Sequence, residues 1–530
     1  MYDCRCESPM MNREAMLDRI RSRREPWDLL VIGGGATGVG AALEAASRGY
    51  EVALLEQSDF GKGTSSRSTK LVHGGVRYLE QGNVSLVMEA LKERGILRQN
   101  APHLVHDLPF VVPNYEWWEA PFYGIGLRIY DLLAGKYGFG ASENLSREET
   151  LERLPTIRPE GLRGGVVYYD GQFDDARLLI HLALTAAEQG AVLVNYCPVT
   201  GLRSGADGLL DGVEARDAET GEEFRVAARA VINATGAFSD AVRRMSDPGA
   251  APRIAPSQGI HLVFPGHFLP GGHAIMVPHT SDGRVMFAIP WHGHTLVGTT
   301  DTPVETAELE PRPKEEEIEF ILSTAALYLE RAPSRGDVLS AFAGIRPLVR
   351  SGEGGNTASL SRDHNIHIER NGLLTIAGGK WTTYRRMAED CVNQAAMLAG
   401  LDERPSVTST LKIHGWRTEA RGAGDLWVYG SDAARIADLV RERPEWGERL
   451  HPDLPYCAAE VVWGVRQEMA RTVDDVLSRR LRALPLNVRA ALAMAPRVAE
   501  LMADELGRDA DWRSAQLGRF SEAAARYEVR

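Results

Sequence analysis

The spacing of apolar and polar residues divides the chain into three kinds of segment. Residues 29–32 form a continuous apolar run, which is typical of a strand buried on both faces; a Gly-rich turn and an Ala-rich helix follow it. A second apolar run, residues 52–55, ends at Glu56. This order predicts a parallel β–α–β unit and places the chain in the α/β class.

Later segments extend this pattern. Residues 230–242 and 372–400 each show a strand, a turn of small residues and the start of a helix. Between residues 254 and 301 the runs alternate and are separated by turns, which predicts antiparallel strands. Residues 12–25 indicate a charged amphipathic helix in an N-terminal extension. After a break at residues 401–405, apolar residues recur at helical spacing, so we expect a helical C-terminal domain.

Composition narrows the function classes. The chain has 530 residues, a net charge of −12 and a pI of about 5.7, which argues against general affinity for nucleic acid. Its five cysteines are scattered without a CxxC pair, so neither a disulfide framework nor a metal site is expected. No apolar run is long enough for a membrane-spanning helix, and no signal peptide is evident; we expect a cytoplasmic protein, with attachment to a membrane surface left open.

The first turn carries a nucleotide-binding pattern. Gly33, Gly35 and Gly38 form G-x-G-x-x-G directly after a strand, where a tight turn brings backbone N–H groups and a helix N-terminus toward a pyrophosphate. Glu56 follows about twenty residues later, at the position of a carboxylate that accepts ribose hydroxyl hydrogen bonds. The motif by itself does not distinguish NAD from FAD.

A second unusual stretch is TSSRSTKLVHGGVRYLEQ, residues 64–81. It combines hydroxyl groups, cations, a histidine and a Gly pair, and it is too polar and too Gly-rich for a simple core element. Small hydroxyl side chains are also typical of ordinary turns, so this stretch by itself does not distinguish a ligand-binding loop from an ordinary turn.

Five motifs together resemble one enzyme family. The Gly motif continuing through LLEQSDFGKGTSSRSTKLVHGGVRYLEQG, then INATGAFSDAV, FAIPWHGHTLVGTTD, AGIRPLV and AGGKWTTYRRMAED, resembles FAD-dependent glycerol-3-phosphate dehydrogenases. These belong to a wider group that includes D-amino-acid and glycine oxidases. The likeness runs from about residue 28 to the C-terminus, where EVVWGVRQEMARTVDDVLSRR resembles the helical cap of that family.

The resemblance implies a Rossmann-type FAD-binding domain, an antiparallel-sheet substrate domain and a C-terminal α-helical domain. We expect an N-terminal extension (1–27), an oxidoreductase domain (28–400) and the helical domain (401–530). Within 28–400, the FAD-binding parts are expected at about 28–110, 165–250 and 340–400, and the substrate-domain parts at about 111–164 and 251–339.

The resemblance also implies which residues face FAD. The expected cofactor-binding residues are Gly33, Gly35, Ala36, Thr37, Gly38, Glu56, Gln57, Thr64, Ser65, Ser66, Ser68, Leu71, His73, Gly74, Gly75, Ala234, Thr235, Gly236, Gly379, Lys380, Thr382 and Thr383. Gly74 and Gly75 would allow the backbone to lie against the flat flavin ring. Helix capping is an alternative role for the two threonines near residue 382.

The implied substrate, sn-glycerol 3-phosphate, carries a phosphate and a secondary alcohol. Arg77, Arg346 and Lys380 match the substrate-site positions, and Arg suits a phosphate because its planar fork donates two hydrogen bonds. Tyr78 is a further substrate contact, although packing is an alternative role for it. His73 and His261 both match positions near the flavin, and either could accept the hydroxyl proton.

The electron acceptor is less constrained by the residues. The resemblance implies a quinone at a membrane, and residues 117–140 are rich in aromatic and aliphatic side chains that could meet a membrane surface or line the substrate domain. An oxidase that uses O₂, or one that acts on another small hydroxy compound or amino acid, remains an alternative. The absence of an obvious long insertion favours the dehydrogenase; a homodimer is left open.

Overall fold

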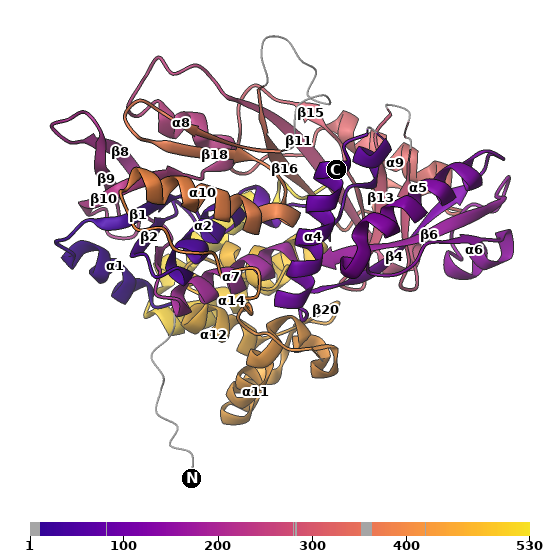
Figure 1. Cartoon of the computed structure of the whole chain (residues 1–530). Coiled ribbons are helices and arrows are strands. Elements are labelled where there is room, and N and C mark those ends of the chain that lie inside the picture. The colour runs from indigo at the N-terminus through magenta and orange to yellow at the C-terminus, as the bar shows by residue number, and fades with distance from the viewer. Residues whose placement is uncertain are drawn as a thin grey trace.

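Two large sheets and a helical C-terminal domain make up the molecule (Figure 1). The computed structural model describes residues 11–80, 82–278, 280, 283–350, 363–418 and 420–529, and only the backbone of Arg77, Glu80 and residues 420–423. Cys197, Cys391 and Cys457 are free thiols, whereas Cys4 and Cys6 lie outside the described residues.

The first sheet has eight strands, and its centre is parallel in the order β18–β10–β1–β2–β7. These strands are β1 (Trp27–Ile32), β2 (Val52–Leu55), β7 (Val192–Val194), β10 (Glu223–Asn233) and β18 (Leu374–Gly378). The remaining members are β8 (Val199–Ser204), β9 (Leu210–Arg216) and β17 (His364–Ile368). The predicted β–α–β unit is therefore confirmed, with both strands at the expected positions.

Helices cover this sheet and complete its core. They are α2 (Ala36–Ser47), α7 (Asp175–Glu188) and α10 (Tyr384–Leu398), and the short helix α8 (Ser239–Arg243) follows β10. Helix α2 is rich in Ala and Gly, and a Cβ at Gly40 would lie only 3.0 Å from the Tyr384 ring. Small side chains therefore allow α2 and α10 to pack closely.

The N-terminal helix α1 (Arg13–Ser22) confirms the helix expected there, but it is packed against the first sheet. Met16, Leu17 and Ile20 belong to the same core as the parallel strands. Arg13 is also buried and forms an ion pair with Asp217 at 2.6 Å. The described part of the predicted extension is thus an integral element of this domain.

The second sheet has ten strands and confirms the antiparallel region expected between residues 254 and 301. Its strands are β3 (Leu71–Val72), β4 (Val105–Asn114), β5 (Glu143–Leu145), β6 (Gly164–Phe173), β11 (Ile254–Pro265), β12 (Ala274–Val277), β13 (Met286–Trp291), β14 (His294–Gly298), β15 (Thr302–Pro303) and β16 (Ser340–Val349). The helices around it are α3 (Val76–Glu80), α4 (Val84–Asn100), α5 (Glu119–Ala134), α6 (Arg147–Arg153) and α9 (Glu315–Tyr328).

The strands of the second sheet do not all fall in the residue ranges expected for the substrate-domain part. Strands β4, β6 and β16 lie wholly or mostly in segments assigned to FAD binding, yet all three pair within the second sheet. Long antiparallel pairing joins β4 to β6 and β11 to β16, and this pairing places these strands in the second sheet.

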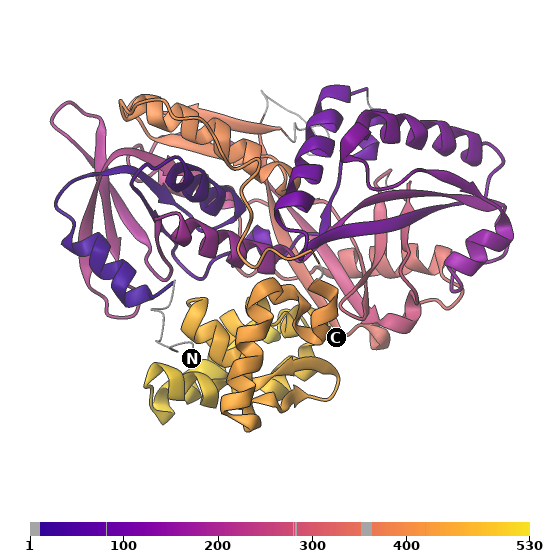
Figure 2. The ribbon, with the colours of Figure 1, turned by 60° about the horizontal axis from the view of Figure 1, so that its bottom comes forward.

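The C-terminal domain is predominantly helical, as predicted, with one hairpin that the sequence did not indicate. Its helices are α11 (Ala433–Glu442), α12 (Ala458–Gln467), α13 (Ala483–Leu486), α14 (Val488–Leu506) and α15 (Ala510–Ala524), and the hairpin is β19 (Arg449–His451) with β20 (Leu454–Cys457). Figure 2 shows the domain lying against the junction of the two sheets. No helix among the described residues is long and apolar enough to cross a membrane.

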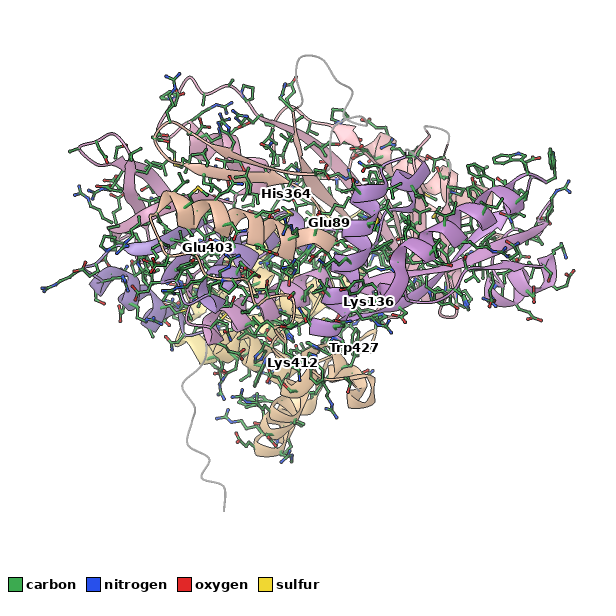
Figure 3. All side chains as sticks on the ribbon, viewed as in Figure 1. Glu89, Lys136, His364, Glu403, Lys412 and Trp427 are labelled. Carbon is green, nitrogen blue, oxygen red and sulfur yellow. The ribbon has the colours of Figure 1, made fainter. Side chains whose placement is uncertain are left out.

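Buried ion pairs join this domain to the rest of the chain. Arg480 binds both oxygens of Asp59 at 2.7 and 2.9 Å, and both side chains are buried. Trp427, marked in Figure 3, lies at the same junction, and its ring stacks on that of His292, between β13 and β14 of the second sheet, with ring centroids 5.8 Å apart. Charge pairing and packing thus fix the domain against the segment 59–70 and the second sheet.

Candidate active site

One large cavity of about 470 Å³ lies between the two sheets. It extends from the Gly-rich turn after β1, past the segment 61–73, to the β11–β16 pair of the second sheet. Most predicted site residues line it: Gly33, Gly35, Ala36, Thr37, Glu56, Gln57, Thr64, Ser65, Ser68, Leu71, His73, Ala234, Thr235, Gly236, His261, Arg346, Gly379, Lys380 and Thr382.

The Gly-rich turn has the geometry that a pyrophosphate requires. Gly33 has φ +109°, and a Cβ there would lie 2.8 Å from the Ala234 carbonyl oxygen. A Cβ at Gly38 would lie 1.9 Å from the Gly33 oxygen, so the helix approaches the strand too closely for any side chain. No side chain caps helix α2 at Gly35. The Ala36 N–H donates to the Ser65 hydroxyl, and the N-terminus of α2, with Gly35, Ala36 and Thr37, lines the cavity. Its positive end therefore lies at the cavity, which fits a dinucleotide cofactor.

Glu56 supports this turn. One oxygen of its carboxylate accepts a hydrogen bond from the Gly34 N–H at 2.6 Å, and the other accepts one from the Ser58 N–H at 2.8 Å. Burial raises the pKa of Glu56, while these two N–H donors act in the opposite direction. The carboxylate thus holds the turn itself, and a ribose hydroxyl would use its remaining lone pairs.

The hydroxyl groups of segment 64–68 mostly hold the protein together. Thr64 donates to the Ile345 carbonyl, and the Ser65 hydroxyl accepts a hydrogen bond from the Ala36 N–H at 2.9 Å. The Ser68 hydroxyl donates to Asp175 at 2.7 Å, and Ser66 is buried outside the cavity lining. The polar composition of this stretch therefore reflects the fixing of a loop between the two sheets as well as the lining of the cavity.

His261 and Arg346 come together through strand register. Gly259 pairs with Gly344 and His261 with Phe342 across β11 and β16. Gly259 leaves space for the Arg346 side chain, since a Cβ there would lie 2.3 Å from Nη2 of the guanidinium group. Arg346 donates to Asp301 at 3.3 Å, to the Thr299 hydroxyl at 3.1 Å and to the Thr300 carbonyl at 2.9 Å. These contacts hold a guanidinium group at the cavity wall, where it can meet an anion.

The His261 ring lies beside this cation. It stacks on Phe342 with ring centroids 5.0 Å apart, and its Nε2 lies 2.9 Å from the Thr69 hydroxyl. Its Nδ1 is buried and has no hydrogen-bond partner among the described residues. Burial and the positive charges of Lys70 and Arg346 hold the pKa of His261 well below its ordinary value, so the ring is neutral at pH 7.

The Gly74–Gly75 pair is closely packed by neighbouring side chains, and its expected role beside the flavin stays a prediction. A Cβ at Gly74 would meet the Tyr130 hydroxyl at 2.3 Å, and a Cβ at Gly75 would meet the Tyr78 ring at 2.5 Å. Neither glycine lines the cavity. Packing of these tyrosines already excludes larger side chains there, so the prediction that the pair makes room for a flavin ring is not needed to explain it.

The other predicted residues take varied places. Tyr78 lies outside the cavity lining, and its ring carries the Lys380 ammonium group 3.9 Å from its centroid. The Thr382 hydroxyl accepts a hydrogen bond from the His73 N–H at 3.2 Å, whereas Thr383 donates to the Lys380 carbonyl. The side chain of Arg77 lies outside the described part of the chain.

Sequence reasoning missed several residues. Thr69 and Lys70 lie inside the conspicuous 64–81 stretch, and that polarity was the available signal. Asp301 lies 45 residues before Arg346, its partner, and no motif connects the two. Such pairs arise only when strands are brought into register.

Comparisons with known proteins agree with this geometry. Residues 28–385 match the family model described as FAD dependent oxidoreductase, and residues 374–513 match the C-terminal domain of alpha-glycerophosphate oxidase. The chain is 43% identical to the mitochondrial glycerol-3-phosphate dehydrogenase of Rattus norvegicus over 97% of its length and 75% of the relative's. For the human protein of the same name the identity is 44%, over 94% of this chain and 73% of the relative.

A solved structure shows the same architecture. The glycerol-3-phosphate dehydrogenase of Bacillus halodurans, complexed with FAD, superposes with a TM-score of 0.80 and 29% identity, and the match covers 98% of both chains. The match includes the helical C-terminal domain as well as both sheets, since it extends over nearly all of each chain.

Proposed function

The chain belongs to the family of FAD-dependent glycerol-3-phosphate dehydrogenases, and from this we propose that its cavity oxidises sn-glycerol 3-phosphate to dihydroxyacetone phosphate and passes the electrons to a quinone. One observation carries the proposal. The same cavity joins the N-terminus of helix α2 at the Gly turn to a neutral histidine and to the cations Arg346 and Lys380.

The described residues fit FAD. The Gly33–Gly35 turn and the start of α2 would hold the diphosphate, Glu56 the ribose, and residues 234–236 and 379–382 the remaining edges of the cofactor. When bound, FAD accepts a hydride and supplies the redox chemistry of the reaction. The protein then has two further tasks, which are to hold the phosphate and to take the hydroxyl proton.

Arg346 is the best-placed phosphate ligand. Its guanidinium group is fixed by Asp301 and by two threonine oxygens, and its side chain remains 23% exposed at the cavity. Lys380 adds a second positive charge, and Arg77 remains a candidate by its position in the motif. A hydrogen bond to a charged group is worth roughly 1.5–3 kcal/mol, so each such contact matters for affinity.

His261 is the base that we favour over His73. Its neutral ring lines the cavity beside Arg346 and can accept a proton from the substrate hydroxyl. The backbone N–H of His73 is bonded to Thr382, and its side chain lines the same cavity. Loss of the imidazole at residue 261 is therefore expected to lower kcat more than loss at residue 73.

Helix α5 supports an acceptor that lies at a membrane. Tyr123, Leu127 and Tyr130 face the core. The opposite face, with the two residues before the helix, exposes large apolar side chains to between 41% and 80%: Trp117, Trp118, Phe122, Ile125, Ile129 and Leu132. Such a face suits the interfacial region of a bilayer, from which a quinone dissolved in the hydrocarbon interior can be reached. We therefore propose a cytoplasmic protein that attaches peripherally to the cytoplasmic face of the cell membrane.

The test is an anaerobic visible spectrum of the purified protein before and after sn-glycerol 3-phosphate is added. We expect flavin bands that bleach with the substrate and return when a quinone is added. A flavin spectrum that the substrate leaves unchanged would contradict the proposed reaction. Recovery with air and peroxide formation, but not with quinone, would instead identify an oxidase.

A further inference from the structure

Lys70 is a fully buried lysine behind the active site. Its ammonium group donates to Asp175 at 2.7 Å and to the Ser66 carbonyl at 2.8 Å. It also lies 5.0 Å from the centre of the Phe342 ring. Burial lowers the pKa of Lys70 to about 7, although Asp175 opposes this effect. So costly a group is retained only where its surroundings hold it by specific contacts.

The C-terminal domain supplies the next contact. Arg482 donates to the other oxygen of Asp175 at 2.8 Å and also to the Ser66 carbonyl at 3.0 Å. Asp175 therefore lies between Lys70 of the loop and Arg482 of the C-terminal domain. The adjacent Asp174 is 3.5 Å from the Arg482 Nε and binds His292 at 2.9 Å, so the charges in this buried group are balanced.

Thr69 is the residue through which this group reaches the active site. It directly precedes Lys70, and its hydroxyl lies 2.9 Å from Nε2 of His261. Lys70 itself has φ +62°, a left-handed backbone conformation that only firm contacts maintain in a residue with a side chain. The backbone at Thr69 is thus fixed by the salt-bridged lysine next to it.

We propose that Thr69 is a positioning residue of the reaction: its hydroxyl accepts the Nε2–H of His261 and leaves Nδ1 as the proton acceptor, and Arg482 of the C-terminal domain fixes Thr69 through Asp175 and Lys70. The inference rests on the proposed function, because it takes His261 as the base. It also assigns a catalytic support role to the C-terminal domain, which otherwise only packs against the two sheets.

The physical reason lies in the two forms of a neutral imidazole. Only the nitrogen without a proton can act as base, and the hydrogen bond made by the other nitrogen decides which one that is. Packing on Phe342 restricts the plane of the ring, but it does not select between the two forms. Thr69 is the hydrogen-bond partner of the ring among the described residues. A hydroxyl can accept or donate, and in the proposed form it accepts the Nε2–H.

The first experiment compares Thr69→Val with Thr69→Ser in the purified, FAD-loaded enzyme. Valine keeps the shape but lacks the hydroxyl group, and serine retains it. We expect Thr69→Val to lower kcat by about 10- to 100-fold, the range for loss of a group that orients an active-site ligand, with KM within about threefold. Thr69→Ser should recover most of kcat. A Thr69→Val enzyme with wild-type kcat would overturn the proposal.

The contribution of the C-terminal domain is tested by comparing Arg482→Met with Arg177→Met. Arg177 is a similarly buried cation whose guanidinium group binds Glu468 and the Arg480 carbonyl of the C-terminal domain, whereas that of Arg482 binds Asp175 and the Ser66 carbonyl. We expect Arg482→Met to lower kcat about tenfold and Arg177→Met to leave it within about twofold. If Arg482 acts through Thr69, the double variant with Thr69→Val should be no slower than Thr69→Val alone. If the two losses in kcat multiply in the double variant, Arg482 does not act through Thr69.

A third measurement needs no variant to turn over. The ¹⁵N spectrum of histidine-labelled wild-type protein, with the His261 signal identified by His261→Asn, reports which ring nitrogen carries the proton. We expect the proton on Nε2, and a proton on Nδ1 would overturn the proposal. This outcome is separate from the proposed function, since an enzyme inert toward sn-glycerol 3-phosphate would refute the reaction and leave the tautomer measured.

Discussion

Gly259→Ala tests the phosphate site through a cavity-lining glycine that packs against the Arg346 guanidinium group. A Cβ at Gly259 would lie 2.3, 2.5 and 2.7 Å from the three guanidinium atoms Nη2, Nη1 and Cζ of Arg346. The backbone of Gly259 lies in strand β11 and is not in the left-handed region, so alanine is tolerated there conformationally. Because the clash involves the end of a flexible side chain, Arg346 should move and the strand should stay.

The expected size follows from what the guanidinium group does. A charge-assisted hydrogen bond is worth roughly 1.5–3 kcal/mol, and about 1.4 kcal/mol is a factor of ten. Displacement of Arg346 should therefore lower kcat/KM for sn-glycerol 3-phosphate by about 10- to 100-fold, chiefly through KM. The added methyl group should change the free energy of unfolding by less than about 1 kcal/mol, because no backbone must shift.

The assay is steady-state kinetics with an artificial electron acceptor, together with thermal unfolding of the same preparations. Arg346→Met sets the value for complete loss of the guanidinium group. Gly518→Ala is the matched control, since a Cβ at that glycine meets nothing within 4 Å and lies in α15 (Ala510–Ala524) of the C-terminal domain. We expect Gly259→Ala to fall between the wild type and Arg346→Met, and Gly518→Ala to match the wild type.

Two results would refute this reasoning. If Gly259→Ala keeps the wild-type KM while Arg346→Met loses affinity, the guanidinium group binds phosphate from a position that the new methyl group does not disturb. If Arg346→Met itself keeps the wild-type KM, Arg346 does not hold the phosphate, and Lys380 or Arg77 must do so.

Three further predictions address the base, the membrane face and pH. Gly298→Ala places a Cβ 2.3 Å from the His261 ring, so we expect kcat to fall at least tenfold with little change in KM, measured by steady-state kinetics; an unchanged kcat would exclude His261 as the base. Ile125→Glu replaces a side chain of α5 that is 63% exposed, and it should weaken sedimentation of the protein with quinone-containing liposomes while activity with a soluble acceptor is retained. Unchanged sedimentation would mean that another surface contacts the membrane. Hydrogen bonds to Asp432 and Glu188 outweigh burial and raise the pKa of His414 to about 9, so its protonation stabilises the folded protein fully below pH 6.5 and is lost as the pH rises through 9. The difference in thermal stability between wild type and His414→Gln, worth about 3 kcal/mol at pH 6, should disappear above pH 9.5, and a difference independent of pH would contradict it.

The elements of the fold with strong local patterns were predictable. Strand β2 begins and ends where its apolar run does, and the Gly33 turn has the positive φ that its motif requires. The alternating runs between residues 254 and 301 became antiparallel strands because alternation directly encodes one buried face. The β19–β20 hairpin was missed, since two short strands within a helical region give almost no periodicity.

The sequence by itself therefore determined the fold class and the cofactor-binding turn, because these depend on spacing within single segments, and the resemblance of its motifs to a known family indicated the main polar residues of the site. Tertiary structure alone decided how the residues act together. It paired Arg346 with Asp301, stacked His261 on Phe342, and brought Arg482 of the C-terminal domain to Asp175, 307 residues away in the chain. Such contacts depend on strand register and domain packing, which satisfy buried charges across the whole molecule and leave no local pattern in the sequence.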